Sequence, residues 1–366
     1  MTHPQPETHF VKGHWDSISG IHRFSHQAMA TTFEIVIQHN DARYAQQAAW
    51  QAFEELDRLE AELSRFIENS DISRINNLAA NQPLQIGLAA FECLQLAAKI
   101  YTETGGAFDI TIGSLLSCWL NEDKTMRTPS QEELDIARQR TGTHLIKLNV
   151  TEHTVQLLAS PVQIDLGGIG KGYALDQMAE LLRDWSIGTA LIHGGFSSVL
   201  ALDAPAETEG WPITLSNPSR RFTSPAAVSC GARRSGKQTR SSGGKQTLAY
   251  LYLQSRAVSG SGLQKGQHII GPREARPVEG KRAAWACGPD AATVDALSTA
   301  FMVMSPDEIE QYCLRHPEVQ AMVIINDRDT EKDKILRFGP WNANASNNPA
   351  TRPSPSLDSA SQQSSA

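Results

Sequence analysis

The sequence predicts an α+β protein. Strand-like runs follow one another closely in places, as in hairpins, and helical segments intervene without the regular alternation of a βαβ chain. The length of 366 residues suits one large domain or two modest ones. No repeat of 20 to 50 residues is visible, so a solenoid is not expected.

The N-terminal elements are a strand followed by a helix that packs on it. Phe33, Ile35 and Ile37 alternate with other residues at the period of a half-buried strand. Apolar residues then recur at helical spacing from Ala49 to Leu63. A second helix is predicted from Ala89 to Tyr101, and it ends before Gly105 and Gly106 because glycine often terminates helices.

The middle of the chain predicts a strand, turn, helix, strand unit. Strands are expected at 144–150, 154–158 and 162–165, and the last of these leads into a glycine-rich turn at 167–172. An amphipathic helix follows from Ala174 to Leu182, and a further strand is predicted at 189–192.

The remaining segments set the expected domain limits. We expect a flexible leader at 1–25, one domain at 26–340 and a disordered tail at 341–366. Within the domain, Arg and Lys accumulate among Ser and Gly at 219–247, which predicts a mobile basic insertion. A helix at 291–304 and a strand at 321–325 complete the core.

Composition excludes several classes of function. The formal net charge is −7, so no overall positive field attracts nucleic acid, and we expect no nucleic-acid partner. The five cysteines are widely spaced and form no Cys-x-x-Cys motif, which argues against a disulfide framework or a zinc cluster. No apolar run is long enough for a membrane span and no signal peptide is visible, so we expect a cytoplasmic protein.

The glycine-rich turn is the first candidate for chemistry. A strand that leads through glycines into a helix presents backbone N–H groups and a positive dipole end to an anion. Neither the Walker nor the Rossmann glycine pattern is present. Asp165 ends the strand and Lys171 adds a positive charge suited to phosphate, so phosphate binding and a simple tight turn both remain open.

Asp295 and Thr299 are the second candidate. They are four residues apart on a predicted helix, so both side chains project from one face. Two oxygen donors placed in this way can share a magnesium ion, whereas a surface Asp and a Thr bonded to its own helix would give the same pattern.

Two further candidates are weaker by themselves. His268 follows the small-residue run 258–262 and can be a general base or a structural side chain. The segment from Gly106 to Asp109 is a turn that carries an aromatic ring and a carboxylate.

Six motifs in order resemble the FAD:protein FMN transferase family. They are MATTFEI (29–35), LSRFIENSDISRIN (63–76), GGAFDITIGSL (105–115), IDLGGIGKGYALD (164–176), HIIGP (268–272) and VDALSTAFMV (294–303). Two departures stand out: Gly271 replaces the family's usual Asp, and GGFSS (194–198) replaces GGN followed by an apolar residue.

The resemblance implies a fold, a site and a reaction. The fold would be T-fold-like, with mixed sheets and packed helices in two intimately associated lobes. The reaction would move the FMN part of FAD to a Thr or Ser hydroxyl of an acceptor protein and release AMP. FAD contacts are implied for Met29, Phe66, Ala107, Phe108, Asp109, Asp165, Lys171 and Ile270.

Magnesium would bind the backbone carbonyl of Gly168 and the side chains of Asp295 and Thr299. His268 or Asp295 would remove the proton from the attacking hydroxyl. Two alternatives stay open: a magnesium-dependent FAD pyrophosphatase that yields FMN and AMP, and a non-catalytic FAD-binding homologue.

Overall fold

The computed structural model describes residues 11–14, 18–121, 123, 125–217, 247–263, 268–326 and 333–341. Its main feature is a sheet with the strand order β16-β15-β14-β11-β8-β7-β3-β2, in which every neighbouring pair is antiparallel. The strands are β2 (Ile21–Ala28), β3 (Thr31–Gln38), β7 (Ala190–Gly194), β8 (Ser198–Ala201), β11 (Arg256–Gly262), β14 (Lys281–Gly288), β15 (Gln320–Asn326) and β16 (Asp333–Phe338). An antiparallel sheet with helices on one face confirms the α+β prediction.

Three smaller antiparallel sheets accompany the large one. They are β1 (Val11–Gly13), β9 (Trp211–Ser216) and β10 (Thr247–Leu253); β4 (Pro83–Gln85), β6 (Thr154–Leu157) and β5 (Ile146–Asn149); and β12 (Ile270–Gly271) with β13 (Arg276–Pro277). The first of these covers one face of the large sheet, where Trp211 and Trp285 are fully buried in a shared apolar cluster.

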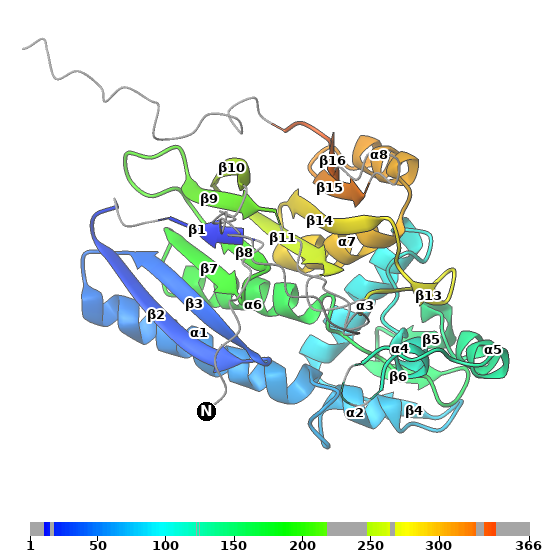
Figure 1. Ribbon diagram of the computed structural model, residues 1–366. Coiled ribbons are helices and arrows are strands. Elements are labelled where there is room, and N and C mark those ends of the chain that lie inside the picture. The colour runs from blue at the N-terminus through cyan, green and yellow to red at the C-terminus, as the bar shows by residue number, and fades with distance from the viewer. Residues whose placement is uncertain are drawn as a thin grey trace, which may run out of the picture.

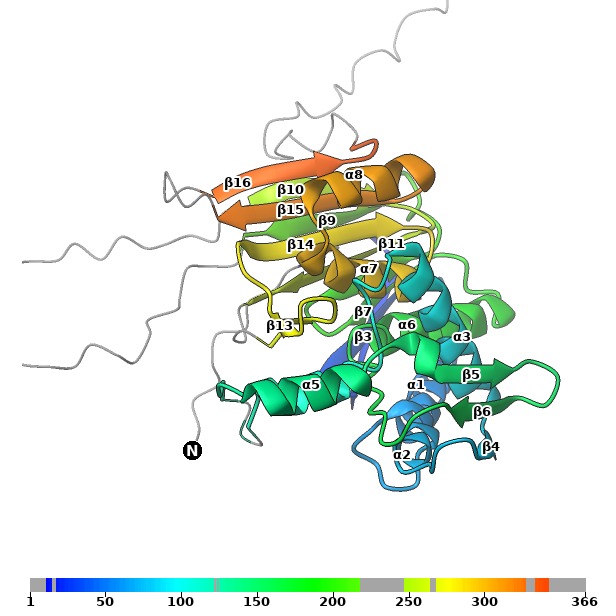
Figure 2. The same cartoon turned by 90° about the vertical axis from the view of Figure 1, so that its right-hand side faces the viewer.

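Helices cover the opposite face of the large sheet (Figure 1). Of these, α1 (Ala42–Leu63), α6 (Gly170–Asp184) and α7 (Ala291–Val303) contact its strands, and α8 (Pro306–Arg315) contacts β15 and β16. The second part of the molecule holds α2 (Asp71–Asn76), α3 (Leu88–Glu103), α4 (Gly113–Trp119), α5 (Gln131–Gln139) and the 3-10 helix η1 (Thr143–Leu145). Figure 2 shows this part below the large sheet, with α5 in front and the β4-β6-β5 sheet beside it.

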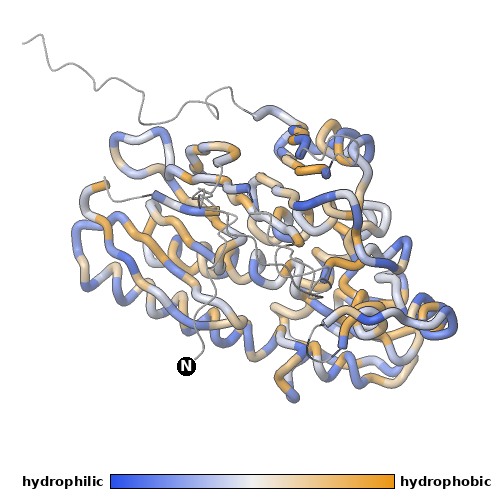
Figure 3. Tube along the Cα trace, in the orientation of Figure 1, coloured by the Kyte–Doolittle hydropathy of each residue, from blue (hydrophilic) through white to orange (hydrophobic). Residues whose placement is uncertain are grey.

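The helices form where the apolar residues recur at helical spacing. Helix α1 buries a stripe from Ala45 to Leu63, and its Asp41 caps the N-terminus by accepting the N–H groups of Arg43 and Tyr44. In Figure 3 this helix alternates between hydrophobic and hydrophilic colours, as expected for a helix with one buried face.

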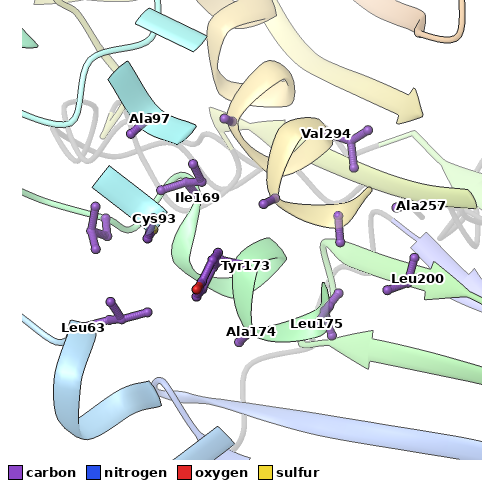
Figure 4. Close-up of a cluster of buried hydrophobic side chains, with 14 of the residues drawn as sticks. Leu63, Cys93, Ala97, Ile169, Tyr173, Ala174, Leu175, Leu200, Ala257 and Val294 are labelled. Carbon is purple, nitrogen blue, oxygen red and sulfur yellow. The ribbon is translucent and has the colours of Figure 1, made fainter. Parts of the chain in front are cut away.

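One apolar core joins the two parts of the molecule. Residues from α1, α3, α6, α7 and the large sheet belong to the same buried cluster. Figure 4 shows Tyr173 and Ile169 pointing toward Cys93 and Ala97 of α3, while Leu175 lies near Leu200 of β8. This continuous packing fixes α6 and α7 relative to both parts.

The structure corrects two expectations and gives the conformation of a third segment. The prediction of a flexible leader at 1–25 is wrong for its described residues, because β1 pairs with β9 and β2 pairs with β3. The strand predicted at 162–165 is also wrong, because only one bridge forms there, between Gln163 and Ile112. The side chain of Asn76 bonds the backbone N–H and the carbonyl of Ile164, where a neighbouring strand would otherwise pair. The small-residue run 258–262 lies within strand β11.

Two expected segments lie outside the described residues. The basic insertion at 219–247 falls there apart from Thr247, which begins β10, and so does the tail at 341–366 apart from Trp341. No helix in the described ranges combines the length and apolar character that a bilayer crossing requires.

Candidate functional site

The glycine-rich turn leads directly into α6. Gly167 donates its N–H to Asp165 Oδ1 at 2.7 Å, and the helix begins at Gly170. Lys171 and Gly172 therefore lie in the first helical turn, where backbone N–H groups have no partner within the helix. The turn and the helix N-terminus together can receive an oxyanion.

Asp295 and Thr299 of α7 face this turn. Lys171 Nζ lies 3.4 Å from Asp295 Oδ2, and the Gly172 N–H donates to the same oxygen at 3.1 Å. A Cβ atom placed on Gly168 would lie 3.3 Å from Thr299 Oγ1, so the Gly168 backbone is close to this hydroxyl. The structure thus brings together the glycine turn, Lys171, Asp295 and Thr299.

Two serines that the sequence analysis did not select orient Asp295. Ser198 Oγ and Ser259 Oγ lie 3.0 Å and 2.8 Å from Asp295 Oδ1, and the Asp295 residue is 3% exposed. The hydroxyl of Ser261 lies 3.2 Å from Thr299 Oγ1. These three hydroxyls fix the orientation of the Asp295 carboxylate and of the Thr299 hydroxyl.

The departure at 194–198 therefore has a structural consequence. Ser198 belongs to GGFSS, and its hydroxyl is part of the support of Asp295. Ser198 and Ser259 are directly paired across β8 and β11. Nothing in the local sequence announces this pairing, because the two residues are 61 positions apart.

Asp165 connects the turn to an exposed aromatic side chain. Arg65 Nε lies 3.0 Å from Asp165 Oδ2, and the Arg65 guanidinium lies 4.7 Å from the centre of the Phe66 ring. Phe66 is 80% exposed. An exposed aromatic ring held by an arginine is suited to stack on a planar ligand.

The segment 106–109 also approaches the glycine turn. A Cβ atom on Gly168 would lie 3.2 Å from the Phe108 ring, and Ala107 is buried beside it. Asp109 Oδ1 accepts hydrogen bonds from the backbone and hydroxyl of Thr111 and from the hydroxyl of Thr143. Burial raises the pKa of the Asp109 carboxyl, and these three bonds oppose that rise. Asp109 thereby fixes the shape of the loop.

Met29 lies at the tip of the hairpin between β2 and β3. Ala28 pairs with Thr31, which leaves Met29 and Ala30 as a two-residue loop, and their φ angles are 50° and 57°. Positive φ at both loop positions is the geometry of a type I′ turn, which glycine or asparagine usually occupies. The position of Met29 is therefore held at a cost in backbone energy.

Ile270 lies in β12, and His268 precedes this strand and is exposed. Ile270 is 4% exposed and packs in a cluster with Leu115 and Cys118. Arg273 joins this region to the other candidate loop, because its Nε donates to the Gly105 carbonyl at 2.9 Å.

Gly271, the second departure, lies beside another carboxylate. A Cβ atom on Gly271 would lie 2.8 Å from Oε2 of Glu274. A carboxylate three residues further along the chain therefore reaches the space next to position 271.

The donor set at the turn fits a hard cation. The Gly168 carbonyl, the Asp295 carboxylate and the Thr299 hydroxyl are all oxygen donors, which Mg²⁺ prefers. Within the described ranges no three His, Cys, Asp or Glu side chains are grouped as a metal site. Such a sparse set is typical of Mg²⁺ sites that take their remaining ligands from water and substrate phosphates. The fold and site thus define an α+β protein with a place for an oxyanion and a hard cation.

Comparison with known proteins gives the family. Residues 29–323 match the model of the ApbE family, so the chain belongs to the ApbE family. It is 25% identical over 311 residues to the FAD:protein FMN transferase of Escherichia coli, covering 84% of each chain. It is 36% identical over 130 residues to the FAD:protein FMN transferase of Chlamydia muridarum, covering 34% of this chain and 41% of the relative.

Solved structures share the fold of this chain. The flavin transferase ApbE from Vibrio cholerae has a TM-score of 0.71 at 19% identity, covering 87% of this chain and 97% of the other. The ApbE protein from Thermotoga maritima has a TM-score of 0.71 at 25% identity with the same coverage.

Proposed function

We propose that this chain transfers the FMN part of FAD to a Thr or Ser hydroxyl of an acceptor protein, with Mg²⁺, and releases AMP. The observation that carries the proposal is the contact between the glycine turn and the Asp295 and Thr299 pair. That contact supplies N–H groups, an ammonium and hard oxygen donors where a diphosphate needs them. The family and its transferase relatives support the choice of FAD as the diphosphate.

The turn and α6 bind and orient the diphosphate. The N-terminus of α6 presents the positive end of its helix dipole, and Lys171 Nζ, now 3.4 Å from Asp295, adds a positive charge. Gly168, Asp295 and Thr299 would hold Mg²⁺. When bound, the ion would offset the negative charge that develops on the phosphate oxygens.

The aromatic and hairpin residues position the flavin end. Phe66 and Phe108 are aromatic, and the Phe108 ring already lies against Gly168. Met29 would add apolar contact area, while the buried Ala107 and Ile270 would shape the site from within the core. Asp109 and Asp165 would hold their loops in place.

We assign proton removal to His268 rather than Asp295. The Asp295 oxygens already face Ser198, Ser259 and Gly172, and the residue is almost fully buried. His268 is exposed, and a histidine is a suitable base near neutral pH. His268→Ala should therefore lower kcat by 10²-fold or more while FAD binding is kept.

A product assay tests the function. The chain is incubated with FAD, Mg²⁺ and an acceptor protein, and AMP and protein-bound flavin are both measured. Transfer predicts one AMP for each acceptor labelled on Thr or Ser. AMP with free FMN and an unlabelled acceptor would instead show hydrolysis, and FAD binding without AMP would show a non-catalytic protein.

A further inference from the structure

Helices α6 and α7 meet at their N-terminal turns with direct backbone contact. A Cβ atom on Gly172 would lie 2.1 Å from the Ala291 carbonyl oxygen and 2.8 Å from Ala292 Cα. Only glycine allows this approach, because the atoms that it meets are backbone atoms.

Each helix places a carboxylate at the N-terminus of the other. Asp295 of α7 accepts the Gly172 N–H of α6 at 3.1 Å. Asp176 of α6 accepts the N–H groups of Ala291 and Ala292, one on each carboxylate oxygen, both at 2.8 Å. These N–H groups belong to first helical turns and have no partner within their own helices, so each carboxylate acts as a cap on the neighbouring helix.

The spacing of these residues makes the exchange reciprocal. Gly172 and Asp176 are four residues apart on one face of α6, and Ala291 and Asp295 are four apart on one face of α7. The two pairs therefore lie opposite one another where the helices meet.

Other side chains also hold the two ends of α7. Asp290 accepts the Thr293 N–H at 2.8 Å. At the other end, the buried Lys281 Nζ donates to the Phe301 carbonyl at 2.9 Å and to the Met304 carbonyl. The helix that carries Asp295 and Thr299 is thus held at both ends, and Asp176 is the link between it and the glycine-turn helix.

We infer that Asp176 is a positioning residue that sets the affinity of the site for Mg²⁺. This inference rests on the proposed function. Asp176 touches neither Asp295 nor Thr299, but it fixes the first turn of α7 against α6 through two hydrogen bonds. Without them the first turn of α7 frays, and Asp295 and Thr299 no longer keep a fixed distance from Gly168. The loss should appear in cation binding more than in the rate at saturating Mg²⁺.

Asp176→Asn tests the inference with nearly unchanged side-chain volume. The asparagine keeps one acceptor and places an NH₂ group opposite the second N–H. Asp184→Asn is the matched control, because Asp184 lies on the same helix, is exposed and undergoes the same substitution. Asp176→Ala is the second variant, and it removes both acceptors.

Two measurements on the full chain are made for each variant. Amide hydrogen exchange without metal or FAD should be about tenfold faster at both Ala291 and Ala292 in Asp176→Ala, at one of the two in Asp176→Asn, and unchanged in the control. Calorimetric Mg²⁺ titration in the presence of FAD should show about tenfold weaker binding in both, with kcat at saturating Mg²⁺ changed less than about threefold.

The outcomes separate this inference from the proposed function. Folded Asp176 variants with the exchange rates and Mg²⁺ affinity of the control would overturn the inference alone, and so would a fall in kcat with unchanged Mg²⁺ affinity. Wild-type chain that binds Mg²⁺ but releases no AMP would overturn the proposed function. The Mg²⁺ affinities of the wild type and the Asp176 variants would still test the role of Asp176. Wild-type chain that binds no Mg²⁺ would overturn both.

Discussion

Gly172→Ala should separate α6 from α7 and weaken the site. The added Cβ would lie 2.1 Å from the Ala291 carbonyl oxygen, where ordinary contact begins at 3.4 Å, so the helices must move apart by more than 1 Å. Overpacking of a rigid contact costs about 1–3 kcal/mol. The Gly172 N–H bond to Asp295, now 3.1 Å long, would be stretched or lost by the same movement.

The assay combines thermal unfolding with Mg²⁺ titration. We expect the Tm of Gly172→Ala to fall by about 3 °C, because a loss of about 2 kcal/mol is divided by an unfolding entropy of about 2.1 cal/mol/K per residue over about 300 residues. The half-saturating Mg²⁺ concentration should rise about fivefold or more, as expected for the loss of one hydrogen bond to a charged group.

Gly170→Ala is the matched control for this substitution. The nearest atom to a Cβ at Gly170 is Leu166 Cβ at 3.7 Å, which is ordinary contact, so this variant should be as stable as the wild type or slightly more so. Equal Tm values and equal half-saturating Mg²⁺ concentrations for Gly172→Ala and Gly170→Ala would refute the reasoning.

Three other substitutions test separate parts of the account. Ala30→Gly should raise stability by about 1 kcal/mol, because glycine adopts the φ of 57° without strain; denaturant unfolding checks this, and an unchanged or lower midpoint would contradict it. Burial lowers the pKa of Lys281 to about 8, so between pH 8 and 10.5 the unfolded chain binds more protons and stability rises with pH. Over this range the free energy of unfolding of the wild type should rise by up to about 3 kcal/mol relative to that of Lys281→Met. Unfolding free energies of the two proteins that change in parallel with pH would contradict this. Ser259→Ala should raise the half-saturating Mg²⁺ about fivefold through the loss of its bond to Asp295, and an unchanged value would show that Ser198 alone suffices.

The fold was predictable where apolar residues follow a clear period. The predicted segments from Phe33 to Leu63 and from Ala291 to Met304 correspond to β3, α1 and α7. Strand β11 was not predicted, because its Ser and Gly residues lack the apolar alternation of a typical strand and are buried between β8 and β14. The leader was misjudged for a similar reason, since the polar β2 gains its order from pairing with β3.

The candidate site was predictable where its residues are close in sequence. The i, i+4 pair Asp295 and Thr299 and the glycine turn each follow from local spacing, and the structure places them together. The supporting residues were not selected, because Ser198 and Ser259 meet Asp295 only through the pairing of distant strands. Long-range pairing leaves no mark on local sequence.

The most direct test of the central claim is the mass of an acceptor protein after incubation with FAD and Mg²⁺. With the wild-type chain, the acceptor should gain one FMN on a Thr or Ser residue while an equal amount of AMP appears. With Asp295→Ala, which removes the carboxylate facing the glycine turn, neither product should form. An acceptor that stays unlabelled with the wild-type chain, or that is labelled equally well with Asp295→Ala, would contradict the account.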